Sequence, residues 1–163
     1  MGNTFFRRNE YQNTGQDSAK TCAEKLAGKL KNDVDLVNLK KTINIDISKY
    51  EKIIIGSSVY VGKIHKEAKM FCENNFNELK DKEIVLFISC MKEGKEAEKQ
   101  LKDNFPEELQ DKALVTGVFG GAFKFDKMNF FERMIIKKIS GNNKSYSNII
   151  EENINEFAEI LNR

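Results

Sequence analysis

The stretch Lys52–Met70 reads KIIIGSSVYVGKIHKEAKM. Its run of isoleucines, Ile53–Ile55, is typical of a strand that is buried on both faces. The small residues Gly56–Ser58 follow, and such residues let a backbone approach a ligand closely. Helical spacing resumes at Lys63. A strand, a turn of small residues and then a helix is how open α/β sheets form ligand crevices at the carboxyl ends of their strands.

Length and composition indicate one globular domain covering residues 1–163. The chain is 40% hydrophobic and 32% charged, which excludes a disordered protein. A net charge of +2, with lysines spread among acids, argues against a nucleic-acid partner. Cys22, Cys72 and Cys90 have no metal-ligand spacing, and we expect reduced thiols in the cytoplasm. No apolar run approaches the roughly 20 residues that span a bilayer.

Strand-like apolar runs alternate with helical patterns along the chain. The expected strands are Val34–Leu39, Lys52–Ser57, Glu83–Cys90 and Ala113–Gly121. The expected helices are Asp17–Lys31, Lys63–Leu79, Glu96–Phe105, Pro106–Gln110, Lys127–Ile139 and Tyr146–Leu161. This alternation predicts a parallel sheet with helices on both faces. If a first strand precedes Asp17, the sheet is five-stranded and the order 2-1-3-4-5 is the most economical.

The N-terminal segment, residues 1–18, is atypical for the central strand that this order requires. Phe5 and Phe6 suit a buried strand. Arg7 and Arg8 would point to opposite faces of the sheet, and burial of unpaired charge is very costly. Either the first strand is short and ends at Phe6, or the segment has another role.

Three stretches carry a resemblance to a known family: IIIGSSVYVGKIHKEA at Ile53–Ala68, VLFISC at Val85–Cys90, and GVFGGAFKFDKMNFFERMIIKKISG at Gly117–Gly141. From about Thr21 onward the chain resembles the flavodoxin-domain family. It looks most similar to the branch that includes menaquinone-dependent protoporphyrinogen oxidases and small clostridial flavodoxin-like proteins. The resemblance implies a flavodoxin-like three-layer α/β/α sandwich that holds FMN non-covalently with three loops.

The first of these loops binds the FMN phosphate in the family. Its Thr/Ser-Gly-x-Thr/Ser pattern leads into a helix N-terminus, where N–H groups and the helix dipole favour an anion. The stretch Asn13–Ser18 matches this pattern in part, because the hydroxyl comes one residue late and Asp17 adds a negative charge. A working phosphate loop and a degraded one both stay open. The candidate ligands are Thr14, Gly15, Gln16 and Ser18.

The other two loops lie against the flavin ring in the family. In Ser57–Gly62, Tyr60 is the candidate stacking partner, and the alternative is an aromatic ring packed over its own turn. Ser89–Met91 matches the second wall, and the alternative is an ordinary buried strand end. The candidate residues of these loops are Ser57, Ser58, Val59, Tyr60, Gly62, Ser89, Cys90 and Met91.

His65 is the only histidine of the chain. It has no Cys or His at ligand spacing, so we expect no metal site. We interpret it as a hydrogen-bonded residue that fixes the junction between loop and helix.

The stretch Phe123–Ile139 combines large apolar residues with lysine and arginine. A helix buried against the sheet is the favoured interpretation. The alternative is an apolar surface ringed by basic groups, which would suit a quinone, a porphyrin carboxylate, a membrane surface or a partner protein.

Two functions remain open from the sequence. The first is an FMN-binding redox protein that transfers electrons or hydride, to or from a quinone or porphyrinogen, with a redox partner protein or a small-molecule acceptor such as a quinone. No catalytic side chain is then expected, because the flavin supplies the chemistry. The second is a cofactor-free binding module with the same fold, which the irregular first strand suggests.

Overall fold

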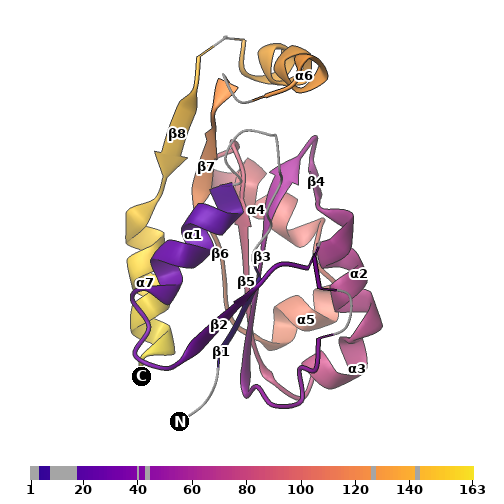
Figure 1. The fold of residues 1–163 in the computed structure, drawn as a ribbon, viewed down its shortest axis with the longest axis vertical. Helices are drawn as coiled ribbons and strands as arrows, with labels where there is room; N and C mark the ends of the chain where they lie inside the picture. The colour runs from indigo at the N-terminus through magenta and orange to yellow at the C-terminus, as the bar shows by residue number, and fades with distance from the viewer. Residues whose placement is uncertain (1–3, 8–17, 40, 43–44, 126–127, 142–143) are drawn as a thin grey trace.

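The stretch Lys52–Tyr60 forms β3, the middle strand of a parallel sheet (Figure 1). The computed structural model describes residues 4–7, 18–39, 41–42, 45–125, 128–141 and 144–163. The parallel strands run in the order β2-β1-β3-β5-β6, and β4 (Lys63–Ile64) pairs with β3 outside this path. The other strands of the path are β1 Thr4–Arg7, β2 Val34–Val37, β5 Glu83–Ser89 and β6 Ala113–Val118. Without β4, the order is the expected 2-1-3-4-5.

Strand β1 covers Thr4–Arg7, so it extends one residue beyond Phe6, where the first of the two N-terminal alternatives ended it. It pairs with β2 along Thr4–Arg7 but with β3 only along Thr4–Phe6. The beginning of the chain therefore does contribute a strand to the centre of the sheet. Residues 8–17, which include most of the expected phosphate loop, lie outside the described residues.

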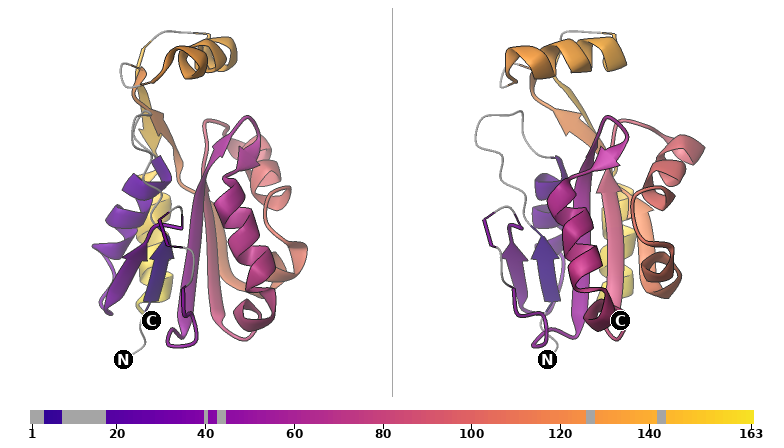
Figure 2. Two further views of the ribbon diagram at one scale, coloured as in Figure 1. Left: turned by 45° about the vertical axis from the view of Figure 1, so that its right-hand side comes forward. Right: turned by 90° about the vertical axis from the view of Figure 1, so that its right-hand side faces the viewer.

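Helices cover both faces of the sheet, which confirms the α/β fold class (Figure 2). Ile53 and Ile55 pack into the core on one face, and Ile54 packs into the core on the other, because successive strand residues point to opposite faces. The first face is covered by α2 Lys66–Asn74, α3 Phe76–Leu79, α4 Gly94–Lys102 and α5 Glu107–Lys112. The second is covered by α1 Ser18–Ala27 and α7 Glu151–Leu161.

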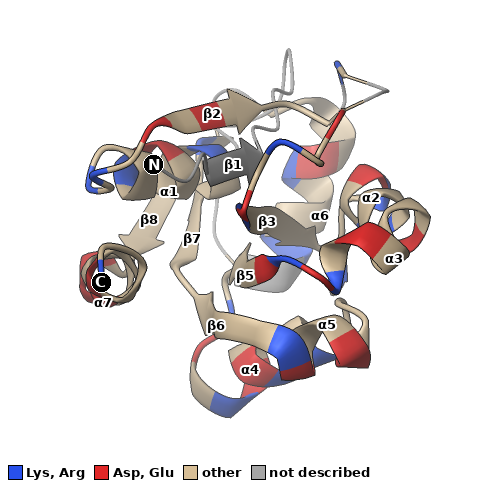
Figure 3. Ribbon diagram, turned by 90° about the horizontal axis from the view of Figure 1, so that it is seen from below, with Lys and Arg blue, Asp and Glu red and all other residues tan. Residues whose placement is uncertain are grey.

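Charges of both signs are mixed on the outer surface of α4 and α5 (Figure 3). Exposed pairs also lie at the two ends of α4: Lys92, just before the helix, with Glu96 at 2.8 Å, and Lys99 with Asp103, just after the helix, at 2.9 Å. Pairs of this kind contribute little stability individually. Among the helices that the structure describes, none is long and apolar enough to cross a membrane.

Gly56 makes room for an aromatic core and not for a ligand, which corrects the interpretation from sequence. It lies opposite Phe87 in the register of β3 and β5. A Cβ atom on Gly56 would lie 2.0 Å from Cζ of Phe87. The Phe87 ring stacks on Phe119 with centroids 4.5 Å apart, and Phe119 meets Phe157 edge to face at 4.6 Å. The missing side chain therefore permits this row of rings.

The helix expected from Lys63 begins at Lys66 instead. Lys63–Ile64 pairs antiparallel with Val59–Tyr60, so the chain first forms a hairpin. Its two turn residues, Val61 and Gly62, have φ of 49° and 77°. Positive φ at both positions is typical of the tight turns that join antiparallel strands, and it is unusual for a β-branched residue such as valine.

The glycines expected at the end of the last strand begin a second, smaller sheet. Gly120–Phe123 forms β7, which pairs antiparallel with β8, Tyr146–Ile149. Gly120 has a φ of 73°, which turns the chain after β6. The expectation that a helix begins at Tyr146 was wrong for its first four residues. They pair with β7, and the Tyr146 ring stacks on Phe123 with centroids 5.9 Å apart.

Helix α6, Phe130–Ser140, connects the two strands of the small sheet and lies beyond the end of the main sheet (Figures 1 and 2). Burial against the sheet was the favoured interpretation from sequence, and it was wrong. Phe130 and Phe131 are 71% and 75% exposed. The periodicity predicted a helix correctly, but its apolar side does not contact the sheet.

Candidate functional site

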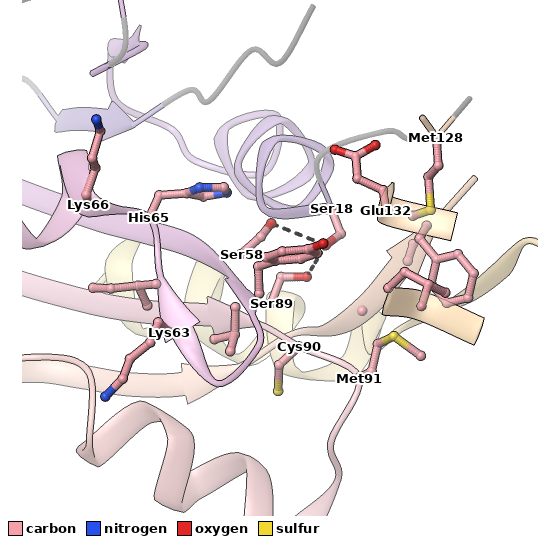
Figure 4. Close-up of a pocket in the computed structure, with 17 residues that line it drawn as sticks. Ser18, Ser58, Lys63, His65, Lys66, Ser89, Cys90, Met91, Met128 and Glu132 are labelled. Carbon is pink, nitrogen blue, oxygen red and sulfur yellow. Dashed lines mark hydrogen bonds between the residues drawn. The ribbon is translucent and has the colours of Figure 1, made fainter. Parts of the chain in front are cut away.

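A cavity of about 330 Å³ lies at the carboxyl edge of the sheet, where β3 and β5 end. Its walls come from the start of α1, the β3–β4 hairpin, the segment after β5, strand β7 and the inner side of α6. The lining residues are Ser18, Ser58, Val59, Tyr60, Lys63, Ile64, His65, Lys66, Ser89, Cys90, Met91, Gly121, Ala122, Phe123, Met128, Glu132 and Ile136. Figure 4 shows this cavity with its lining side chains.

Three serine hydroxyls converge at the base of the cavity (Figure 4). Oγ of Ser89 lies 2.6 Å from Oγ of Ser18 and 2.7 Å from the carbonyl oxygen of Gly120. Because a hydroxyl has one proton and a carbonyl only accepts, Ser89 donates to Gly120 and accepts from Ser18. Oγ of Ser58 lies 3.4 Å from Oγ of Ser18 and accepts the backbone N–H of Ala19 at 3.1 Å. These bonds tie the start of α1 to β3 and β5.

The expected second loop contributes three of its five candidates to the cavity: Ser58, Val59 and Tyr60. Tyr60 lines the cavity and is 40% exposed. The other two candidates, Ser57 and Gly62, do not line the cavity. The Ser57 hydroxyl accepts the backbone N–H of His65 at 3.2 Å, which joins the hairpin to α2. The Gly62 carbonyl accepts from the side-chain amide of Asn104 at 3.0 Å.

The expected third loop lines the cavity with all of its candidates, Ser89, Cys90 and Met91. Its backbone is held by β7, because the Cys90 N–H donates to the Gly120 carbonyl at 2.9 Å. Gly121 packs so closely that a Cβ there would lie 2.5 Å from the Cys90 carbonyl oxygen. Burial raises the pKa of the Cys90 thiol, and a hydrogen bond with the Lys92 backbone lowers it less. Cys90 therefore presents a neutral, largely apolar wall.

The expected first loop is described only at its end. Thr14, Gly15 and Gln16 lie outside the described residues. Ser18 is 7% exposed and lines the cavity with its hydroxyl in the serine cluster.

His65 lines the cavity, which its interpretation as a junction residue did not include. It is the N-cap residue of α2, where its backbone carbonyl accepts the N–H of Ala68 at 2.9 Å and its side chain makes no capping hydrogen bond. In Figure 4 its ring extends toward the side where Ser18 and Ser58 lie, whereas the Lys63 and Lys66 side chains point away. Among the described residues, no group of three His, Cys, Asp or Glu is placed to hold a metal ion.

The outer wall of the cavity comes from residues that sequence reasoning did not assign to the site. They belong to β7 and α6, and they are Gly121, Ala122, Phe123, Met128, Glu132 and Ile136. Glu132 also completes a capping box, since its carboxylate accepts the Asn129 N–H at 3.0 Å while the Asn129 side chain accepts the Glu132 N–H at 2.9 Å. The Asn-x-x-Glu spacing was a readable sign of a helix start, but nothing in it indicated a cavity.

The sequence profile described as the flavodoxin domain matches residues 13–149. No curated protein matches the chain at a significant level. A profile match over this much of the chain identifies the family.

Among solved structures, oxidised flavodoxin 1 from Bacillus cereus is 11% identical, with 98% of this chain and 96% of that one covered and a TM-score of 0.54. The two-electron reduced flavodoxin of Megasphaera elsdenii is 15% identical, with coverages of 78% and 89% and a TM-score of 0.53. The rubredoxin oxygen:oxidoreductase of Desulfovibrio gigas is 13% identical, with coverages of 94% and 36% and a TM-score of 0.52. At these identities the structures show a shared fold. The profile match, which spans most of the sequence, establishes that the chain belongs to the flavodoxin domain family.

Proposed function

We propose that the cavity binds FMN and that the protein transfers electrons or hydride through it. The observation that supports this most is the meeting of three separate segments at one cavity: the start of α1, the Ser58–Tyr60 part of the hairpin, and Ser89–Met91. These are the segments that hold FMN in the family that the sequence resembles. When bound, FMN supplies one- and two-electron transfer at its ring.

The residues present fit a flavin. A volume of about 330 Å³ lies in the range of about 300–1,000 Å³ that small-molecule sites occupy. Tyr60 offers an aromatic face that is open enough for a planar ring to stack on. The Ser18, Ser58 and Ser89 hydroxyls give the cavity a polar side, while Cys90 and Met91 give an apolar side. The protons of Ser18 and Ser89 are donated within the serine cluster, so toward a ring edge these two oxygens can act only as acceptors. Thr14, Gly15 and Gln16 remain the candidates for the phosphate.

The acceptor in this proposal is a redox partner protein or a small apolar molecule such as a quinone, and a porphyrinogen, which is already reduced, would be an electron donor. The outer wall supports a small apolar acceptor, because Phe123, Met128 and Ile136 all face the cavity. We also propose that the chain is related to the branch of menaquinone-dependent protoporphyrinogen oxidases, which its sequence resembles. In this scheme the chain itself positions the ring and excludes water, and no side chain acts as acid or nucleophile.

One observation favours the second function, a binding module without cofactor. The Ser58 hydroxyl already accepts the N–H of Ala19 in the first turn of α1, and the Ser18 hydroxyl is within bonding distance of Ser89. Some of the hydrogen-bonding groups at the start of α1 are therefore already paired with other residues of the chain. A phosphate that bound there would have to replace part of this network.

Titration with FMN and with riboflavin tests the proposal and separates its two parts. We expect saturable quenching of flavin fluorescence with a Kd below about 10 µM, which corresponds to roughly −7 kcal/mol. If the segment before Ser18 binds the phosphate, FMN should bind at least about tenfold more tightly than riboflavin. Equal affinities for FMN and riboflavin would mean that no phosphate loop contributes to binding, but they would be consistent with a site for the flavin ring. Unchanged fluorescence of both flavins at saturating protein would support the cofactor-free module.

A further inference from the structure

Helix α6 stands outside the three layers of the fold, at one end of the molecule (Figures 1 and 2). It is carried there by the small antiparallel sheet of β7 and β8. Of the α6 side chains that the structure describes, only Ile136 is buried, and it faces the cavity together with Glu132. The side of α6 that faces away from the cavity is exposed to solvent.

Local signals define both ends of this helix. At its start, Asn129 and Glu132 form the reciprocal capping box. At its end, Gly141 has a φ of 72° and its N–H donates to the Lys137 carbonyl at 2.9 Å, which is how glycine commonly ends a helix. The helix is thus specified by its own sequence and is held in place with its apolar side outward.

The outward side is strongly apolar at its beginning. Phe130, Phe131 and Met134 are 71%, 75% and 56% exposed. With about 100° between successive residues of a helix, these three lie within a sector of about 100°. The two phenylalanine rings meet edge to face with centroids 5.9 Å apart, so they form one continuous patch. Exposed apolar side chains that cluster together, unlike those scattered singly, mark an interaction surface.

The charges on α6 are nearly all positive. Its sequence contains Arg133, Lys137 and Lys138, and its one acid is Glu132. The Glu132 carboxylate turns to the helix start and the cavity, where it accepts the Asn129 N–H. Both lysines are exposed in the last turn, beyond the aromatic patch. The outward side therefore combines an apolar patch with basic groups and presents no carboxylate of its own.

We propose that α6 binds the surface of an anionic lipid bilayer. Phe130, Phe131 and Met134 would insert at the level of the headgroups, and Lys137 and Lys138 would contact lipid phosphates and carboxylates, as amphipathic helices with basic polar sides do. The opposite charges of the helix and such a bilayer are the reason for choosing it. A helix that projects from one end also suits a deformable surface better than a protein partner that must supply a matching groove.

This docking would place the cavity next to the bilayer, since Glu132 and Ile136 on the inner side of α6 line its outer wall. An apolar molecule dissolved in the membrane would then reach the cavity without crossing water. The docking itself does not depend on FMN, so it goes beyond the proposed function and can be tested with or without flavin.

The test uses the full chain and vesicles of phosphatidylcholine with or without about one third phosphatidylserine. The chain contains no tryptophan, so Phe131→Trp introduces a single reporter on the docking side. We expect its emission to shift to shorter wavelength with the anionic vesicles, and co-sedimentation of the unaltered protein to be at least about tenfold stronger with them than with phosphatidylcholine alone. Phe130→Ser with Phe131→Ser, and separately Lys137→Glu with Lys138→Glu, should each lower binding by about tenfold or more.

Matched changes elsewhere provide the controls. Leu114→Ser alters a side chain that is 49% exposed on β6, and Lys95→Glu with Lys102→Glu alters two exposed lysines of α4. Both control proteins should bind anionic vesicles as the unaltered chain does. Equal binding to the two kinds of vesicle, or equal loss in the controls, would overturn the proposal. Absence of vesicle binding together with self-association that the Phe130/Phe131 change abolishes would also overturn it, and would assign the patch to a second copy of the chain.

Discussion

Helices α1 and α6 both line the cavity, but they are held in place by different means. In α1, Cys22 and Leu26 are fully buried, and α1 packs on the sheet beside α7. In α6, caps define both ends and one described side chain is buried. The first helix takes its position from the core of the protein, whereas the second takes it from local bonds and a small sheet. The cavity wall formed by α1 is thus part of the packed core, whereas the wall formed by α6 is joined to the fold only through the small sheet.

This difference has a functional consequence. Changes in the α1 wall should alter folding and ligand binding together, because Ser18 is bonded into the same network as Ser58 and Ser89. Substitutions in α6 should alter the outer wall of the cavity without changing the fold of the rest of the chain. Helix α6 is therefore the part of the site where the proposed acceptor or docking surface can vary independently of the part that we propose to bind flavin.

The largest contrast is expected between two phenylalanines. Phe87 is fully buried between Gly56 and Phe119, and Phe131 is 75% exposed on α6. Phe87→Ala should lower the free energy of unfolding by about 3–5 kcal/mol, because it leaves a cavity in the aromatic row. Phe131→Ala should change it by less than about 0.5 kcal/mol. Urea unfolding measures both, and similar losses for the two variants would mean that α6 is part of the core.

A smaller effect is expected at the cavity itself. Tyr60→Ala removes the candidate stacking ring and should weaken flavin binding about tenfold, which is roughly 1.4 kcal/mol. Met70→Ala on α2 removes a side chain that is 52% exposed and lies outside the cavity, so it serves as the control. Both variants should unfold at nearly the same urea concentration as the unaltered chain. An unchanged flavin affinity for Tyr60→Ala would exclude this ring as a stacking partner.

The architecture of the sheet was predictable because its signals are local. The run Ile53–Ile55 and the run Ile84–Ile88 are apolar at every position, which only a strand covered on both faces requires. The carboxyl ends of adjacent parallel strands meet at one edge, so Ser58 and Ser89 could be expected near one another. Their register, Ser58 opposite Ser89, then follows from the pairing of β3 with β5.

The errors fall where pairing or neighbours decide the structure. The two-residue strand Lys63–Ile64 has no periodicity of its own and exists only through its pairing with β3. The segment Tyr146–Ile149 has polar residues in its middle and becomes a strand because β7 is available to it. Gly56 was recognised as a place of close approach, but the sequence could not indicate that the approaching group is Phe87.

Helix α6 shows the same limit most clearly. Its spacing predicts a helix with a wide apolar side, and spacing alone does not indicate what covers that side. The outer wall of the cavity was missed for this reason, since Glu132 and Ile136 reach the site only through the position of α6.

The smallest expected effect is on the stability of α6 alone, and it tests whether the α6 wall of the cavity opens independently of the sheet. Asn129→Ala removes the capping hydrogen bond to the Glu132 N–H and should destabilise α6 by about 1 kcal/mol. Because few α6 side chains contribute to the core, this loss should remain local, and hydrogen exchange should become about fivefold faster in α6 while amides of β3 and β5 keep their rates. Faster exchange in the strands as well would mean that α6 unfolds together with the sheet. Exchange confined to α6 would establish a helix that opens independently while Ser18, Ser58 and Ser89 keep the rest of the site intact.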